Sequence, residues 1–143
     1  MEMSPQMSRG FRALKVWMSI RTYGFDALGA LIEQNVRQAR YLAELVDAAP
    51  DLERLAPVEL NIVCFRFAPE DVPDRRLDVI NEHILRGLHH DGVAVPSHTC
   101  VNGRFALRVA ITNHRSRFED FDVLVEEVSR RGAALMDGAG LTA

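Results

Sequence analysis

Lysine is almost absent from this chain of 143 residues, because Lys15 is its single lysine among 17 basic residues. Cysteine is scarce as well: Cys64 and Cys100 form no disulfide framework, and they predict two free thiols in a cytoplasmic protein. Residues 1–9 have no apolar core of a signal peptide, and no apolar run approaches the length of a membrane span. A formal charge of −3 gives no reason to expect nucleic acid or an anionic membrane as a partner.

Several common site motifs are also lacking. There is no Gly-rich phosphate loop before a helix, no Gly-x-Ser-x-Gly and no recognisable Ser-His-acid triad. The five histidines show no spacing of a metal site, so we predict surface histidines and no metal; they are His83, His89, His90, His98 and His114. The alternative interpretation places His98 and His114 near the mouth of an active site.

Hydrophobic spacing and turn residues divide the chain into four predicted helices and four predicted strands. The helices begin at the predicted caps Ser8, Asp26, Asp74 and Ser116, and end at or before Gly24, Pro50, Gly92 and Gly132. Ser116 with Glu119 matches the capping-box pattern. The strands are predicted around residues 52–56, 60–67, 93–95 and 104–111, and a loop with Pro96, Asn102 and Gly103 joins the last two.

This order of elements predicts an α+β fold. Neighbouring strands joined by short loops favour antiparallel pairing, and the long helices would cover mainly one face. The expected architecture is therefore a two-layer sandwich with a small, mainly antiparallel sheet, and the run at 60–67 is apolar enough for an interior strand. A ferredoxin-like arrangement is the alternative. We expect a disordered start at 1–7, one domain at 8–131 and a flexible Gly- and Ala-rich tail at 132–143.

One segment resembles a known family. Residues 8–24, SRGFRALKVWMSIRTYG, are similar to the segment that opens the C-terminal part of the group II pyridoxal-phosphate-dependent amino-acid decarboxylases, which include aromatic-L-amino-acid decarboxylase. Four further segments resemble this family in the same order, at 57–66 (with NIVCFR), 95–99 (VPSHT), 105–111 (FALRVAI) and 120–128. The resemblance covers about residues 8–132.

The resemblance implies the small C-terminal domain of a fold-type-I pyridoxal enzyme, which in this family packs on a large cofactor domain in a homodimer. It also implies that the Schiff-base lysine, the ring-stacking histidine and the aspartate of the pyridinium nitrogen lie in an upstream domain. Lys15 is outside that context, so we expect no catalytic and no cofactor-binding residue here, and no pyridoxal phosphate bound to this chain alone.

Two hypotheses follow for the function. In the first, the chain is the C-terminal domain of a pyridoxal-phosphate-dependent carboxy-lyase, inactive without a cofactor domain that the same gene or a split-gene partner would encode. In the second, it is a free-standing binding or dimerisation module derived from that domain. A homo-oligomer is expected in either case.

Arg108 is the candidate substrate-binding residue. On a strand, Arg108 shares one face with Ala106 and Ala110, which leave room beside its guanidinium. Such an arginine binds a carboxylate through two parallel hydrogen bonds. The glutamate decarboxylases, by resemblance, carry an arginine at the matching position, at the substrate end of the active site. The alternative is an arginine that faces solvent or pairs with a helix.

The first predicted helix carries several cations, at Arg9, Arg12, Lys15 and Arg21. One interpretation is a basic face that docks the cofactor domain or steers an anionic cofactor, and the other is a solvated helix face. Trp17 and Tyr23 on the same helix are typical of a core or an interface.

Overall fold

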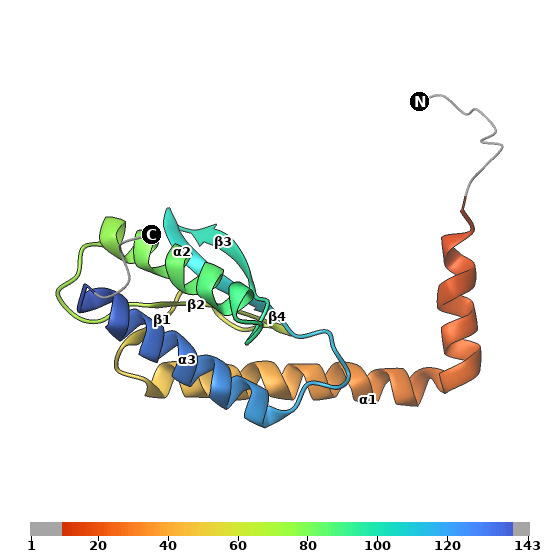
Figure 1. Cartoon of the computed structure of the whole chain (residues 1–143). Coiled ribbons are helices and arrows are strands. Elements are labelled where there is room, and N and C mark those ends of the chain that lie inside the picture. Colours follow the sequence, from red (N-terminus) through yellow and green to blue (C-terminus); the bar gives the residue numbers. More distant parts are fainter. Residues whose placement is uncertain (1–9, 139–143) are drawn as a thin grey trace. The chain divides into compact units, whose positions relative to one another are not determined.

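A computed structural model describes residues 10–138 of the chain (Figure 1). The predicted start at 1–7, the predicted cap Ser8, the cation at Arg9 and the tail residues 139–143 lie outside the described part. The chain divides into two compact units, residues 1–33 and 34–143. Within residues 10–138, no helix is long and apolar enough to cross a membrane.

The first unit is helical from Arg12 onwards. Helix α1 is Arg12–Ala48, and it is interrupted at Gly24, whose φ of 80° and ψ of 162° are not helical. Glycine adopts this backbone conformation because it has no Cβ, so the predicted break between two helices at Gly24 is confirmed. The first helical segment is described from Arg12 onwards, and the second continues from the first unit into the second.

The second unit contains a four-stranded sheet in the order β1-β2-β4-β3. Strands β1 (Leu52–Arg54), β2 (Ile62–Phe67), β3 (Ser97–Val101) and β4 (Arg104–Ala110) pair antiparallel throughout. The predictions of an antiparallel sheet and of an interior strand at β2 are thus confirmed. The ferredoxin-like alternative is wrong, because no pair is parallel in this sheet and that arrangement contains a split βαβ unit.

The strand predicted at residues 93–95 is wrong. Strand β3 lies four residues later, inside the segment predicted as a loop. A two-residue turn decides this, since Asn102 (φ 52°) and Gly103 (φ 80°) both have the positive φ that a tight hairpin requires. The Asn-Gly pair therefore joins β3 directly to β4, and Val95 is left outside the sheet with 82% of its surface exposed.

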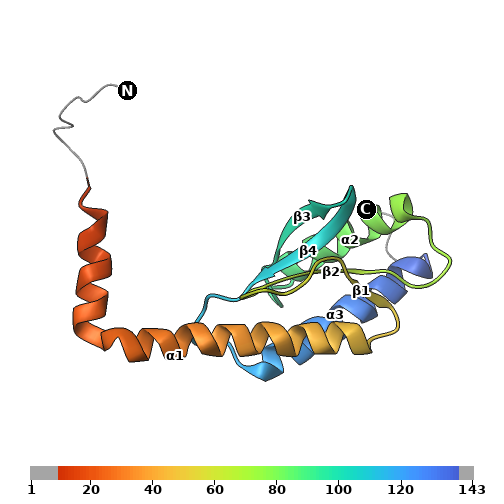
Figure 2. The same ribbon diagram turned by 180° about the vertical axis from the view of Figure 1, so that it is seen from behind.

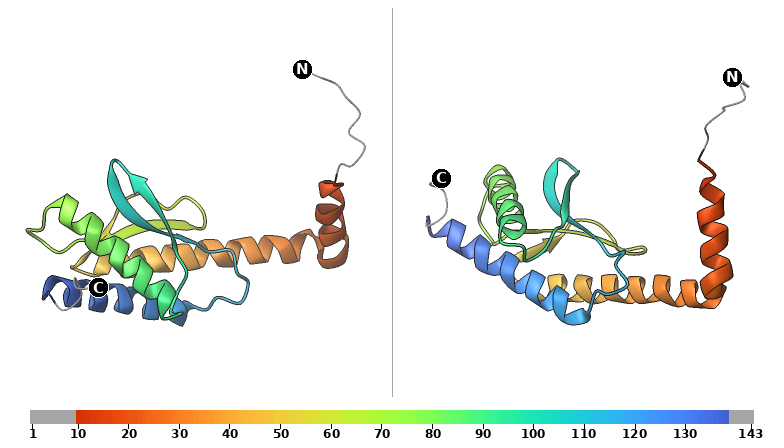
Figure 3. Two further views of the ribbon diagram at one scale, coloured as in Figure 1. Left: turned by 45° about the horizontal axis from the view of Figure 1, so that its top comes forward. Right: turned by 45° about the vertical axis from the view of Figure 1, so that its right-hand side comes forward.

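The helices build one core against one face of the sheet. Helices α2 (Asp74–His90) and α3 (Phe118–Met136) pack on each other and on β2, together with the last turns of α1. Helix α2 lies in front of the strands in Figure 1 and behind them in Figure 2, and Figure 3 shows it beside α3. The sheet contributes the fully buried side chains of Val63, Phe65 and Leu107 to this core. The α+β prediction, with helices over a small antiparallel sheet, is confirmed.

Helix α3 differs from the prediction at both ends. Its N-cap is Arg117 rather than Ser116, because the carboxylate of Asp120, rather than Glu119, accepts a hydrogen bond from the backbone N–H of Arg117 at 2.8 Å. The helix also continues through Gly132 to Met136, where a helix end was predicted. Gly132 is buried against Phe67, so this glycine makes close packing possible instead of ending the helix. The segment expected as a tail is helical over its first residues.

Candidate functional site

Arg108 lies in the middle of β4, between two strands. Its Cα partners are Cys64 in β2 and Ser97 in β3. The Ser97 hydroxyl donates to the carbonyl oxygen of Arg108 at 3.1 Å and accepts from the guanidinium Nη1 at 3.4 Å. Because residues on neighbouring strands that pair directly share a face, these three side chains gather on the sheet face opposite the core.

The two alanines beside Arg108 differ in their surroundings. Ala110 is exposed, so the side of the guanidinium toward the end of β4 is open as predicted. Ala106 is fully buried, so the expectation of free space on both sides is wrong at this position. Arg108 is therefore approachable from one side.

Cys64 adds a half-buried thiol to this face. Burial raises its pKa, and the positive charge of Arg108 lowers it by a smaller amount. The net effect is a raised pKa, so the thiol stays protonated at neutral pH and adds no negative charge beside the guanidinium. Cys64 and Cys100 are both free, as the sequence predicts.

A cluster of ion pairs occupies the other end of the same face. The buried guanidinium of Arg66 donates from Nε to Glu53 at 2.9 Å and from Nη2 to Asp74 at 2.6 Å. Glu53 also accepts from Arg104 at 2.7 Å. The sequence analysis missed this cluster, although an arginine inside the apolar run of β2 was a usable signal.

Arg108 differs from the other arginines on this face because it has no acidic partner in the described part of the chain. Arg66 and Arg104 both form salt bridges, whereas Arg108 forms none with the residues that the structure describes. Its polar contact is the neutral Ser97 hydroxyl. A guanidinium in this state has donors left for a bidentate contact with a carboxylate or another planar anion.

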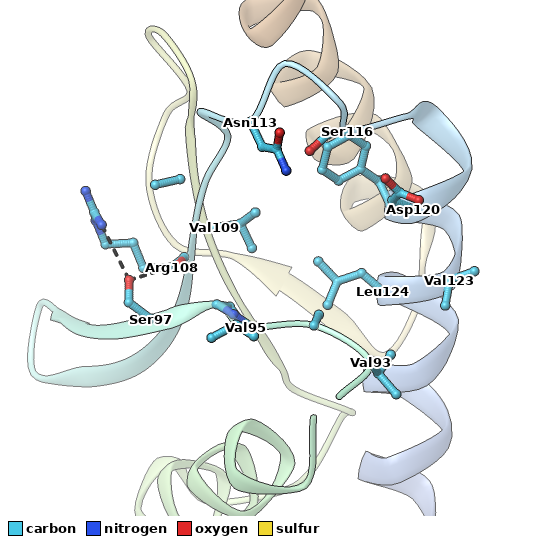
Figure 4. Close-up of a pocket in the computed structure, with 14 residues that line it drawn as sticks. Val93, Val95, Ser97, Arg108, Val109, Asn113, Ser116, Asp120, Val123 and Leu124 are labelled. Carbon is cyan, nitrogen blue, oxygen red and sulfur yellow. Dashed lines mark hydrogen bonds between the residues drawn. The ribbon is translucent and has the colours of Figure 1, made fainter. Parts of the chain in front are cut away.

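A cavity of about 530 Å³ lies between β4 and the start of α3, and Ser97 and Arg108 are among the residues that line it (Figure 4). Val109 and Leu124 point toward each other across it, with Asn113 and Asp120 at its polar end. The Arg108 side chain points away from this cavity, toward Ser97. An anion held by Arg108 would therefore sit on the open sheet face rather than in the cavity.

The histidines form no common site. The ring of His98 stacks on Phe105 at 5.4 Å between centroids, and since Phe105 packs against the core, His98 faces away from Arg108. On α2, His89 lies 2.7 Å from the carbonyl of Pro96 and His90 lies 3.0 Å from Asp91. Within residues 10–138, no three metal-ligating side chains gather.

The first unit exposes an unusual amount of apolar surface. A shallow apolar groove, lined by Val16, Ile20, Phe25, Leu28 and Ile32 with Lys15, Ser19 and Gly29, runs along its two helical segments. Further large apolar side chains are exposed at Phe11, Leu14, Trp17, Met18, Tyr23 and Leu31. Exposed apolar patches of this kind mark interfaces, which agrees with the interpretation of Trp17 and Tyr23. The Arg21 guanidinium lies 5.8 Å from the ring of Trp17.

Comparison with known proteins places the chain in a family. The profile of the pyridoxal-dependent decarboxylase conserved domain matches residues 1–68. Tyrosine decarboxylase 2 of Arabidopsis thaliana is 34% identical over 105 residues, which cover 73% of this chain and 19% of that protein. The chain is a domain of the pyridoxal-dependent decarboxylase family. The aromatic-L-amino-acid decarboxylase of Bacillus atrophaeus is 30% identical over 132 residues, or 87% of this chain and 28% of the relative.

Solved structures show the same fold. Oryza sativa TDC, solved with PLP and tryptamine, matches 92% of this chain with a TM-score of 0.82 and 29% identity, over 29% of its own length. The glutamate decarboxylase domain of a Vibrio parahaemolyticus protein matches 85% with a TM-score of 0.74 and 29% identity, over 26% of its length. The chain thus spans less than a third of the proteins that it matches.

The described residues of this chain do not fit pyridoxal phosphate by themselves. The cofactor needs a lysine for covalent linkage, a carboxylate for its ring nitrogen and donors for its phosphate. Lys15 is exposed on α1, and the groove beside it is lined by apolar residues and Ser19, with no carboxylate and no second cation. Arg108 is in the other unit.

Proposed function

We propose that this chain is the C-terminal part of a pyridoxal-phosphate-dependent amino-acid decarboxylase, in which Arg108 binds a carboxylate of the substrate. The unpaired guanidinium of Arg108 carries this proposal. The Arg108 guanidinium has no acidic partner among the described residues, and its neighbours are the neutral Ser97 hydroxyl and the protonated Cys64 thiol. This arrangement leaves the guanidinium able to bind an anionic ligand. The similarity of the chain to amino-acid decarboxylases supports an amino-acid substrate as that anion.

The role of the chain in the reaction is binding and packing. Pyridoxal phosphate, when bound in the whole enzyme, supplies the electron sink for loss of carbon dioxide. This chain contributes no group to that covalent chemistry. Arg108 orients the substrate through a charge-assisted contact, and the sheet holds the arginine at a fixed position on a rigid element.

The proposed partner is the cofactor-binding part of the same enzyme, encoded in one gene or in two. The apolar surface of the first unit supports this partner, because Phe11, Trp17, Phe25 and Ile32 each expose more than half of their surface. Burying side chains of this size contributes about 1.5–3 kcal/mol each, which makes such a helix pair a strong docking element. The exposed cations Arg12, Lys15 and Arg21 would form the polar rim of that interface.

The same surface supports the alternative of a free-standing dimerisation module. A chain that lacks its partner covers exposed apolar surface by pairing with itself. In the purified chain we therefore expect self-association through the first unit, and Trp17→Glu or Phe25→Glu should shift the species toward monomer. Light scattering over a concentration series measures this. A clean monomer at high concentration, with Trp17 emission typical of a buried indole, would contradict the expectation.

A co-expression experiment tests the proposed function. The chain is produced together with the cofactor-binding part of a relative that lacks the matching segment, and the complex is assayed for bound pyridoxal phosphate and for release of carbon dioxide. The proposal expects a complex that is active only with both parts, and the Trp17→Glu variant should weaken its formation. Absence of any complex, with self-association alone, would favour the dimerisation module.

The chain alone should not bind pyridoxal phosphate covalently, since its single lysine lies in a groove without the other groups that the cofactor needs. Purified chain is mixed with pyridoxal phosphate, and the long-wavelength absorbance of a lysine-bound cofactor is recorded, followed by borohydride trapping and mass spectrometry. Lys15→Arg serves as the matched control and should leave the activity of the complex unchanged. A stoichiometric adduct on Lys15 that supports release of carbon dioxide would contradict the proposal.

A further inference from the structure

Ser97 contacts both the backbone and the side chain of Arg108. Its Oγ donates to the Arg108 carbonyl at 3.1 Å, and the Arg108 Nη1 donates to the same oxygen at 3.4 Å. Figure 4 shows both contacts, with the hydroxyl lying below the guanidinium on the open side of the sheet. A serine hydroxyl has one proton and two lone pairs, so it can make these two hydrogen bonds at once.

The position of Ser97 is itself fixed by its neighbours. It is the first residue of β3 and the Cα partner of Arg108, so the register of the hairpin sets its place. Pro96 before it has a restricted φ, and the Pro96 carbonyl accepts a hydrogen bond of 2.7 Å from Nε2 of His89 on α2. The hydroxyl is thereby held from both the strand and the helix.

We propose that Ser97 is a positioning residue, which orients the Arg108 guanidinium for the substrate carboxylate; this inference rests on the proposed function of Arg108. A long arginine side chain on an open face has many rotamers, and a binder that is already ordered loses less entropy when the ligand arrives. Ser97 orders the guanidinium without neutralising it, which an aspartate or glutamate at this position would do. A neutral oxygen is therefore the suitable partner for an arginine that must keep its charge free.

The ordering is tested on the chain as it stands. Nitrogen-15 relaxation of the Arg108 Nε–H reports the mobility of the guanidinium on the nanosecond timescale. Ser97→Ala should make this group more mobile, and Ser97→Thr, which keeps the hydroxyl, should not. The matched control is Thr99→Ala, since Thr99 lies two residues along β3, opposite Ala106. Equal mobility of Arg108 in wild type and Ser97→Ala overturns the positioning role.

The catalytic consequence is tested in the complex with the cofactor-binding part. Ser97→Ala should raise KM about three- to tenfold, as expected for loss of one modest hydrogen bond, while Ser97→Thr and Thr99→Ala stay within about twofold. In the Arg108→Ala background, Ser97→Ala should have no further effect, because it acts through Arg108. An additional loss in that background overturns the inference. Unchanged kinetics of Arg108→Ala would instead show that the proposed function itself fails.

Discussion

Arg108→Ala should reduce kcat/KM of the assembled enzyme by about one to two decades. A charge-assisted hydrogen-bonded contact is worth about 1.5–3 kcal/mol, and about 1.4 kcal/mol corresponds to a factor of ten in rate. The guanidinium forms no salt bridge with the described residues, so the substitution removes its interaction with the substrate and no internal ion pair. Steady-state kinetics with a series of substrate concentrations measures the effect.

The same substitution should change stability little. Arg108 is only partly buried, and its removal leaves no buried charge uncompensated, so the free energy of unfolding should stay within about 0.5 kcal/mol of wild type. Arg75→Ala, at an exposed position of α2, is the control for loss of an arginine as such.

Arg66→Ala, in contrast to Arg108→Ala, should lower stability, because it leaves Glu53 and Asp74 without the cation that they share.

The neighbours of Arg108 sharpen this test. Ala110 is exposed, so Ala110→Leu should fill the open side of the guanidinium and lower activity while the fold persists. Ala106 is fully buried, so Ala106→Leu should overpack the sheet and lower stability. If Arg108→Ala and Ala110→Leu both leave the kinetics of the complex unchanged, Arg108 is a solvated arginine and the chain has a purely structural role.

Gly132→Ala should destabilise the second unit by about 1–3 kcal/mol, although alanine is the better helix former by about 1 kcal/mol. A Cβ at Gly132 would overlap three ring carbons of Phe67. Phe67 is itself buried in the core, so its ring cannot move without disturbing the packing of β2. The overpacking therefore outweighs the gain in helix propensity, and a denaturant titration measures the difference.

Gly87 provides the matched control. It is also a helical glycine, but the atom nearest to an added Cβ is Nη1 of Arg131, the far end of a flexible side chain, at 2.6 Å. Gly87→Ala should therefore cost less than Gly132→Ala, because the end of an arginine side chain shifts more readily than a ring in the core. Phe67→Leu should recover part of the loss in Gly132→Ala, since the smaller side chain makes room. Equal stability of wild type and Gly132→Ala would show that Phe67 adapts freely and that the packing there is loose.

The core and the break in the first helix were predictable because they depend on local pattern. Alternation along β4 placed Leu107 in the core and Arg108 on the other face, and this needs only the two-residue period of a strand. Gly24 was predictable for a similar reason, because a glycine after an apolar helical stripe ends it. The family resemblance also depended on short segments in the right order.

Other features needed the tertiary structure. Gly132 looked like a helix end, and only the position of Phe67, far away in the sequence, shows that its missing Cβ serves close packing. The strand β3 was missed because its residues, Ser97–Val101, alternate weakly and are mostly exposed, and the Asn-Gly turn was interpreted as part of a longer loop. At Gly132 a contact between distant segments overrode the local signal, whereas at β3 the local Asn-Gly turn set the strand.

The sequence by itself determined the class of fold, the family and the face on which Arg108 lies, because periodicity and short motifs are local properties of a chain. The tertiary structure decided which cations on that face are free. Arg66 and Arg104 form salt bridges with Glu53, and Arg66 also pairs with Asp74. Arg108 instead lies beside Ser97 and Cys64, which are uncharged. All of these contacts are between residues of different strands, or of a strand and a helix. The net charge around a side chain depends on its neighbours in space, and strand order and register fix those neighbours.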